Sequence, residues 1–333
     1  MISPQAIRLL MKVTMKRLFN KLQIFFRLIK GIDWEYTVPM LFIYMKYREE
    51  TARRNALKFL KLAYFERRFS HLLSEYKKKT FVNHCNDGPI WICWLQGTSS
   101  MPPVVKTCYK RLKEMAPPSR EVILLTWKNL EHYAFIPDYI IEKVRKGIMS
   151  YIHFSDIIRF SVLAEHGGLW VDSTVYVSSP IDQSVFEHTY FSVRTEYDTE
   201  SEYKYNGINR CQWKCFILGG AAHSAWYSCA RDMIFEYWRN NNFFMDYLII
   251  DYILLTIYDS IGSVRREVDA GIEIAQHIFL LEKIANCPFD EKKYKEICKG
   301  CRWFKLSYKI PFREETEDSQ LTYFGNIMRK QSI

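Results

Sequence analysis

An acidic and a basic residue three positions apart, followed by two glycines and a second acidic residue, form the most chemically informative part of this sequence. Asp156 and Arg159 share one face of a predicted helix, because residues three apart in a helix are neighbours. Asp172 lies within a β-branched and aromatic segment at 169–177, which predicts a strand. A carboxylate in a buried strand is costly unless it binds something. The combination predicts a site for a charged, phosphate-bearing ligand.

Gly167 and Gly168 separate the helix from the strand. Glycine is favoured where a chain leaves a helix through a left-handed residue, so we expect the helix to end there. Alternate side chains of a strand share a face. The pattern therefore places Trp170, Asp172 and Thr174 on one side of the predicted strand.

The segments before this site alternate between strand and helix patterns. Short apolar runs predict strands and amphipathic runs predict helices, at 89–95 and 121–126 and at 104–115 and 137–146 respectively. This order predicts an α/β domain with a largely parallel sheet. Ligands of such sheets bind at the carboxyl ends of the strands. Gln96 and Asp172 both lie at or near such ends.

Later segments add weaker candidates. Strands are predicted at 190–195 and 214–218, and helices at 225–240 and 246–258. A small-residue loop after the second strand contains Gly219, Gly220 and His223, which either face a ligand or serve the structure. Asp251 is either a buried polar contact or a residue that reaches a reacting hydroxyl. Lys305 and Lys309 are candidates for contacts to a diphosphate.

Positive charge is concentrated near the start of the chain. The net charge is +10, and residues 1–80 hold 18 Lys and Arg but only 6 Asp and Glu, so the remainder is nearly neutral. Residues 5–30 combine an apolar helical stripe with basic residues mostly off it, as in a helix that lies on an anionic membrane surface. A helix packed on the protein body with solvated lysines is the alternative. We divide the chain into a basic helical segment at 1–82 and an α/β domain at 83–330.

Composition excludes several classes of protein. With 48% hydrophobic residues the chain can bury a core, which excludes general disorder. Nine scattered cysteines indicate the reduced thiols of a cytoplasmic protein, and Cys298–Cys301 is a CxxC without a second pair at zinc-ligand spacing. No apolar run of about 18 residues predicts a transmembrane helix, and the start does not have the pattern of a secretory signal.

Three motifs together resemble a known family. They are the apolar strand and loop at 90–97, Ser-Asp-x-x-Arg at 155–159 and Gly-Gly-x-Trp-x-Asp-x-Thr at 167–174. In this order and spacing they are similar to the capsular polysaccharide synthesis glycosyltransferases, relatives of the family 32-type sugar transferases. The resemblance spans about residues 88–310. It implies a GT-A, Rossmann-like fold, a nucleotide-sugar donor and transfer to a growing surface glycan.

The resemblance also implies roles for individual residues. Trp94 would stack on the base of the donor, and Asp156 and Arg159 would hold the donor sugar and its diphosphate. Asp172 matches the first carboxylate of a DxD motif, which binds a divalent metal, Mn²⁺ or Mg²⁺, and the ribose. Thr174 replaces the second carboxylate, and a hydroxyl binds such metals more weakly. The further donor-binding candidates are Gln96, Ser155, Trp170, Gly219, Gly220 and His223, and the catalytic candidates are Asp156, Arg159, Asp172 and Asp251.

We expect a UDP-sugar donor, retention of configuration and a lipid-linked oligosaccharide acceptor. The enzyme would lie on the inner face of a bacterial plasma membrane, held peripherally by residues 5–30. One alternative is a nucleotide-sugar-binding protein without transfer activity, which Thr174 leaves open. Another is a protein that docks on a membrane or nucleic acid through its basic segment, although the nearly neutral body carries no nucleic-acid fold signature.

Overall fold

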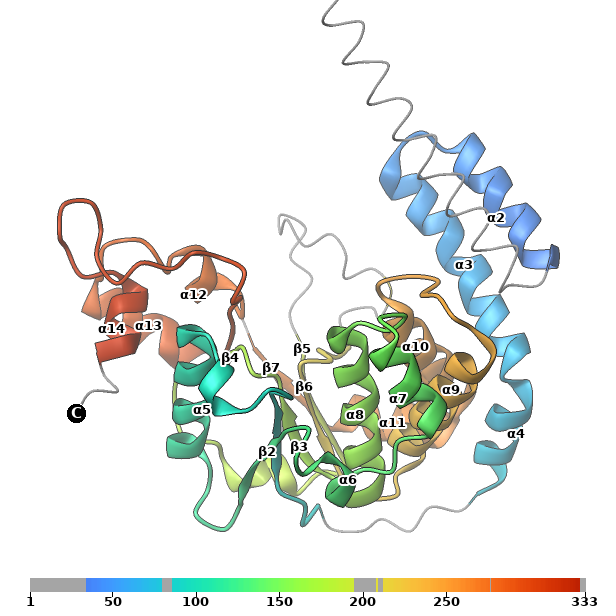
Figure 1. Ribbon diagram of the computed structural model, residues 1–333, viewed down its shortest axis with the longest axis horizontal. Helices are drawn as coiled ribbons and strands as arrows, with labels where there is room; N and C mark the ends of the chain where they lie inside the picture. The colour runs from blue at the N-terminus through green and yellow to red at the C-terminus, as the bar shows by residue number, and fades with distance from the viewer. Residues whose placement is uncertain (1–33, 80–85, 195–207, 209–211, 276, 330–333) are drawn as a thin grey trace, which may run out of the picture.

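A six-stranded sheet lies at the centre of the protein (Figure 1). The computed structural model describes residues 34–79, 86–194, 208, 212–275 and 277–329, so the helix predicted at 5–30 lies outside the described residues. The strand order is β2-β1-β3-β6-β5-β7, and a separate two-stranded sheet pairs β4 with β8. The strands are β1 (Ile90–Cys93), β2 (Val122–Leu125), β3 (Gly168–Val171), β4 (Val175–Val177), β5 (Tyr190–Arg194), β6 (Ile217–Gly220), β7 (Ile272–Ile274) and β8 (Trp303–Lys305).

Helices connect the strands and extend the fold at both ends of the described chain. The α-helices are α2 (Trp34–Lys46), α3 (Glu50–Arg68), α4 (Ser70–Lys78), α5 (Pro103–Met115), α6 (Leu130–Tyr133), α7 (Asp138–Arg145), α8 (Tyr151–His166), α9 (Ala225–Asn240), α10 (Ile249–Ser260), α11 (Gly262–Ala270), α12 (Leu280–Lys283), α13 (Glu291–Gly300) and α14 (Tyr323–Arg329). Two short 3₁₀ helices span Thr98–Ser100 and Gln183–Phe186.

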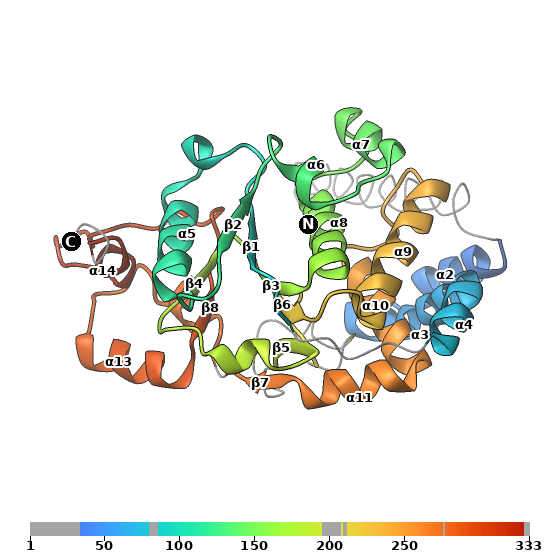
Figure 2. The same ribbon diagram turned by 90° about the horizontal axis from the view of Figure 1, so that it is seen from below.

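The sheet is covered on both faces. Figure 2 shows α5 and the two-stranded sheet on one side, and α8, α9 and α10 on the other. The alternation of side chains in β1 serves both cores: Ile90 and Ile92 pack in the core that contains Val105 of α5, whereas Trp91 packs in the core that contains Ile157 of α8. The predicted α/β, Rossmann-like architecture with an N-terminal helical region is confirmed.

The sheet is mixed rather than largely parallel, which corrects one expectation. β1 runs parallel to β2 and β3, and β5 runs parallel to β7, but β6 is antiparallel to both of its neighbours, β3 and β5. An apolar run indicates that a segment is a buried strand. It does not indicate the direction of that strand, which depends on the neighbours that complete its hydrogen bonds.

The strand predicted at 169–177 is two strands in two different sheets. β3 ends at Val171, where its register with β6 ends, and the amide of Val175 donates to the carbonyl of Asp172 across a turn. β4 then pairs with β8. The turn places Asp172 just beyond the carboxyl end of β3. The prediction that Thr174 shares a strand face with Trp170 and Asp172 is therefore wrong, because Thr174 lies after the turn.

The N-terminal helices pack on the α/β body through aromatic residues. The ring of Phe65 in α3 lies 6.2 Å from Tyr252 of α10 and 6.5 Å from Tyr237 of α9, and Lys61 forms an ion pair with Asp246. The helical structure predicted for the segment at 1–82 is confirmed for its residues 34–79. No helix in the described part of the chain has the length and apolarity to cross a bilayer.

The glycine pair between α8 and β3 is required by close backbone contact. Gly167 and Gly168 have φ angles of 64° and 92°. A Cβ on Gly168 would lie 2.1 Å from the carbonyl oxygen of Pro89, which accepts a hydrogen bond from the amide of Leu169 and so cannot retreat. The chain can therefore turn from helix to strand here only without a side chain.

We expect Gly168→Ala to lower the free energy of unfolding by about 3 kcal/mol, because it adds a backbone clash to an unfavourable φ. Urea denaturation measures the loss. Gly147→Ala is the matched control: Gly147 has a φ of 68° but nothing within 4 Å of its Cβ position, so we expect a loss of only about 1 kcal/mol. Equal losses in the two variants would contradict the role of the close contact.

Candidate active site

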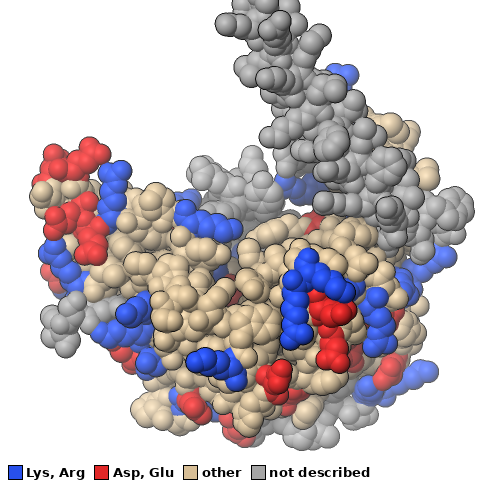
Figure 3. All heavy atoms as spheres, in the orientation of Figure 1, with Lys and Arg blue, Asp and Glu red and all other residues tan. Residues whose placement is uncertain are grey.

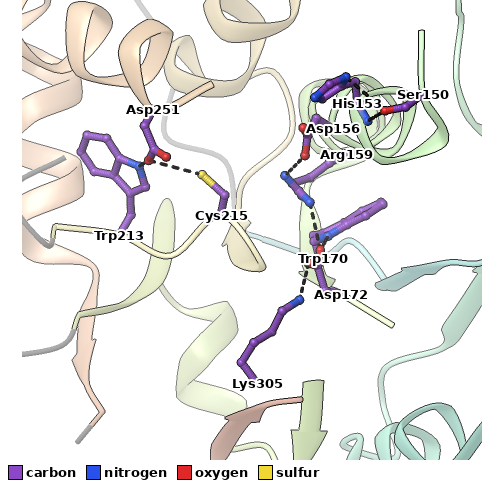
Figure 4. A network of polar contacts seen from close by, with 10 residues as sticks. All are labelled: Ser150, His153, Asp156, Arg159, Trp170, Asp172, Trp213, Cys215, Asp251 and Lys305. Carbon is purple, nitrogen blue, oxygen red and sulfur yellow. Dashed lines mark hydrogen bonds and ion pairs between the residues drawn. The ribbon is translucent and has the colours of Figure 1, made fainter. Parts of the chain in front are cut away.

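Asp156, Arg159 and Asp172 meet at the carboxyl end of β3 (Figure 4). Nη1 of Arg159 donates to Oδ1 of Asp156 at 2.7 Å, and Nη2 donates to Oδ1 of Asp172 at 2.9 Å. One guanidinium therefore joins two carboxylates that come from different elements, α8 and the end of β3.

Helix and strand dimensions explain why these side chains meet. The glycine pair sends the chain from α8 directly back along the sheet as β3. Arg159 lies eight residues before Gly167, or about 12 Å along a helix, and Asp172 lies four residues after Gly168, or about 13 Å along a strand. The two side chains therefore lie at the same level. The N-terminus of α8 is fixed by Ser150, whose hydroxyl accepts from the amide of His153.

Two further residues surround the Asp172 carboxylate. Nζ of Lys305, at the end of β8, donates to Oδ2 of Asp172 at 2.7 Å. Nε1 of Trp170 donates to Oδ1 at 2.8 Å, and the Arg159 guanidinium lies 5.0 Å from the centre of the Trp170 ring. Both oxygens of Asp172 therefore accept hydrogen bonds from charged groups of the protein.

The charged groups differ in their access to solvent. The side chain of Arg159 is 5% exposed, whereas those of Asp156, Asp172 and Lys305 are 19%, 24% and 22% exposed. Figure 3 shows a furrow in this face of the molecule with acidic atoms inside it. Arg159 thus lies beneath the two carboxylates. Of the two cations, Arg159 and Lys305, the lysine is the more exposed.

The pKa values of the two carboxylates are shifted in opposite directions. Burial raises the pKa of Asp156 to about 6, against the opposing effect of Arg159, and the carboxylates of Asp172 and Asp251 add to the shift. Burial alone would also raise the pKa of Asp172, but Lys305 and Arg159 outweigh it and hold that pKa well below its usual range. Asp172 is therefore charged throughout the neutral pH range, whereas Asp156 gains a proton in mildly acidic solution.

Comparison with known families identifies one match. The family model of the capsular polysaccharide synthesis proteins matches residues 42–327, a range that contains the whole cluster. The chain belongs to this family. No curated protein and no solved structure matches the chain.

Asp251 lies at the edge of the same cluster in this capsular polysaccharide synthesis protein. It lies in the first turn of α10, and its Oδ1 accepts from Nε1 of Trp213 at 3.1 Å and from Sγ of Cys215 at 3.8 Å. Figure 4 shows Cys215 between Asp251 and the pair Asp156–Arg159. Burial and then Asp251 raise the pKa of the Cys215 thiol well above its usual value, so it stays protonated.

Trp94, Gln96 and Ser155 lie near this edge of the sheet. Trp94 follows β1, whose carboxyl end is beside that of β3 because the two strands are parallel. Its Nε1 donates to the hydroxyl of Ser100 at 3.0 Å, and its ring meets Tyr308 edge to face at 5.7 Å. Gln96 is exposed in the following turn. Ser155 hydrogen-bonds to the Cys93 thiol, whose pKa burial raises to about 12 with a further contribution from Asp172.

Gly219, Gly220 and His223 lie at the other end of β3. Gly219 and Gly220 belong to β6 instead of the predicted loop, and they pair with Leu169 and Gly168. His223 is exposed and its amide donates to the carbonyl of Ala164 near the end of α8. Because β6 is antiparallel to β3, its first residue, Ile217, lies near Asp172. Its glycines lie at the opposite end of β6, away from Asp172.

The described residues do not form a ready divalent metal site. Both oxygens of Asp172 are engaged by protein donors, and Thr174, the second predicted ligand, is 7% exposed beyond the turn. In the described part of the chain, no group of three or more His, Cys, Asp or Glu side chains could hold a metal ion. Mg²⁺ is usually bound through one or two carboxylates together with water and substrate phosphate oxygens, so an ion here would depend on ligands from outside the protein.

The ion pair between Lys305 and Asp172 is the feature that sequence reasoning missed. The sequence indicated Lys305 only as a candidate contact to a diphosphate. Its contact with Asp172 could not be predicted, because 133 residues separate the two. The available signal was the short run of apolar residues Trp303, Phe304 and Leu306, which indicates a strand that includes Lys305. The partner of that strand, β4, was hidden within the single strand predicted at 169–177.

Proposed function

We propose that this protein is a glycosyltransferase of capsular polysaccharide biosynthesis that uses a nucleotide-sugar donor. Membership of the family supports a role in capsule synthesis. The observation that carries the enzymatic proposal is the partly exposed pair of carboxylates, Asp156 and Asp172, held by Arg159 and Lys305 at the carboxyl end of β3. This is the edge at which open α/β sheets bind their ligands.

The site offers one group suited to the sugar and one suited to the base of a nucleotide-sugar. Oδ1 of Asp156 accepts from Arg159, and within the described residues nothing donates to Oδ2, which is suited to accept from a sugar hydroxyl. Trp94 at the end of β1 is suited to stack on the base. Arg159 fixes the two carboxylates in one geometry through a planar, two-pronged contact, a task suited to a guanidinium.

In the proposed reaction the bond between C1 of the sugar and the diphosphate oxygen breaks. Its electron pair goes to the nucleoside diphosphate, the acceptor oxygen bonds to C1, and the proton of the acceptor hydroxyl passes to the released diphosphate. The negative charge that develops on the leaving oxygen is stabilised by cations held in place beforehand. We propose retention of configuration at C1.

We further propose a lipid-linked oligosaccharide as the acceptor. Such an acceptor would be presented at a membrane surface, and the excess of Lys and Arg in residues 1–80 supports binding to anionic lipid. The inner face of the plasma membrane is the corresponding location.

A thermal-shift panel of UDP-, GDP-, CMP- and dTDP-sugars tests the proposal. We expect a UDP-sugar to raise Tm by about 5 °C at a hundredfold excess over its Kd, because a ligand that binds only the folded state stabilises it. Asp172→Ala should abolish the shift, and Glu317→Gln, at a highly exposed carboxylate, should leave it unchanged. Stabilisation by none of these nucleotides would contradict the proposed function.

A further inference from the structure

The position of Lys305 has a consequence for how the donor is bound. Its Nζ lies 2.7 Å from Oδ2 of Asp172, the carboxylate that resembles the first position of a DxD motif. Of the two cations that contact Asp172, Arg159 is nearly buried and Lys305 is the accessible one. A ligand that enters from solvent therefore reaches the lysine ammonium before the Arg159 guanidinium.

Lys305 is held in place from several directions. It ends β8, which pairs with β4 through Lys305 and Val175, just after the turn that contains Asp172. Its Nζ also lies 5.0 Å from the centre of the Phe216 ring. The carbonyl of Phe216 accepts from the amide of Asp172 at 2.9 Å, so the three residues form one connected unit. An ammonium fixed in this way needs little rearrangement to meet a ligand.

The segment that contains Lys305 also reaches the residue proposed to stack on the base. Leu306 donates its amide to the carbonyl of Thr174, and Tyr308 meets Trp94 edge to face. One short stretch of chain, 305–308, thus contacts both the carboxylate at the proposed diphosphate position and the tryptophan at the proposed base position. With the base on Trp94, Lys305 would lie toward the diphosphate part of the donor.

The same contacts leave little for a divalent ion to bind. A metal at Asp172 would have to displace Lys305 from Oδ2, and the second predicted ligand, Thr174, has a buried hydroxyl-bearing side chain in place of a carboxylate. An ammonium donates up to three hydrogen bonds. One goes to Asp172, which leaves two for phosphate oxygens.

We propose that the Lys305 ammonium serves as the counter-ion of the donor diphosphate, in place of a divalent metal, so that the protein binds its donor without one. This inference rests on the proposed function. Asp172 then serves to hold Lys305 and Arg159. Lys305 stabilises the charge on the diphosphate both in the bound donor and as the sugar leaves.

Calorimetric titration of the full chain with UDP tests this inference, with inorganic pyrophosphate as a probe that lacks the base. In excess EDTA we expect UDP to bind with a Kd within about threefold of its value in Mn²⁺ or Mg²⁺. Lys305→Met, which keeps the length of the side chain but removes its charge, should weaken both probes by at least about tenfold in EDTA. Lys305→Arg should retain most of the affinity.

Lys299→Met is the matched control, because Lys299 is an exposed lysine at the end of α13. It should leave both affinities unchanged, and circular dichroism establishes that each variant is folded. Binding that occurs only with metal and is abolished by EDTA would overturn the inference while leaving the proposed function intact. Absence of UDP and pyrophosphate binding under every condition would overturn both. If Lys305→Met does not fold, the EDTA titration of the unaltered protein still tests whether the donor binds without a metal.

Discussion

Replacing Arg159 by Ala is expected to abolish sugar transfer and to destabilise the protein by about 3 to 5 kcal/mol. The substitution leaves Asp156 and Asp172 partly buried without the guanidinium that joins them, and removal of one partner from a buried ion pair has a cost of this size. Turnover should fall by about a thousandfold or more, because Asp156 loses the geometry in which it meets the donor and Asp172 loses one of the two cations that it holds. Donor consumption and urea denaturation measure the two effects.

Arg159→Lys separates charge from geometry. A single ammonium keeps the positive charge but cannot make two planar contacts to two carboxylates. We therefore expect a variant that is more stable than Arg159→Ala yet still loses about a hundredfold in turnover. Full activity in Arg159→Lys would show that position 159 supplies only charge.

Replacement of Asp by Asn is expected to have opposite effects on the stability of the protein at positions 172 and 156. Asp172→Asn should destabilise the protein at pH 7 by about 3 kcal/mol, because it removes a carboxylate that two cations stabilise. Asp156→Asn should stabilise it above pH 6 by about 2 to 3 kcal/mol, because the carboxylate is costly where burial has raised its pKa from 3.8 to about 6. The amide oxygen of Asn can still accept from Arg159.

The pH dependence of these effects follows from the direction of each shift. Asp172 has a depressed pKa in the folded protein, so its contribution is present above its ordinary pKa of 3.8 and is lost only as the pH falls through the depressed value. Asp156 has a raised pKa, so the stability gained by Asp156→Asn is complete above about pH 6 and disappears as the pH falls below 3.8. Thermal and urea unfolding between pH 4 and pH 8 measure both variants against the unaltered protein: the loss in Asp172→Asn should stay constant over this range, and the gain in Asp156→Asn should shrink toward pH 4. Destabilisation by Asp156→Asn at pH 8 would contradict this account.

Much of the framework follows from local pattern. The apolar run that contains Trp91 predicts a buried strand, and β1 is that strand. Gly167 and Gly168 predict the end of α8, and their positive φ angles and close contacts give the physical reason. The pair Asp156–Arg159 follows from helical spacing alone, since residues three apart share a face.

Other features depend on which segments become neighbours in space. The sequence at 169–177 has the alternation of one strand, but its two halves join different sheets because β6 pairs with the first half and β8 with the second. Gly219 and Gly220 have the composition of a ligand-binding loop, yet they fill β6 where the strand passes close to Gly168. The composition of a segment is compatible with more than one structure, and the strand with which the segment pairs decides which structure it adopts.

The sequence by itself determined the α/β class, the helix with its paired Asp156 and Arg159, and the glycine turn that brings Asp172 to the same level. These depend on contacts between residues close together in the chain, which periodicity and backbone preference control. Only the tertiary structure decided that Lys305 contacts Asp172, that Asp251 lies beyond Cys215, and that Arg159 lies beneath the site. Those arrangements depend on the packing of distant strands and helices, whose order and direction no local pattern specifies.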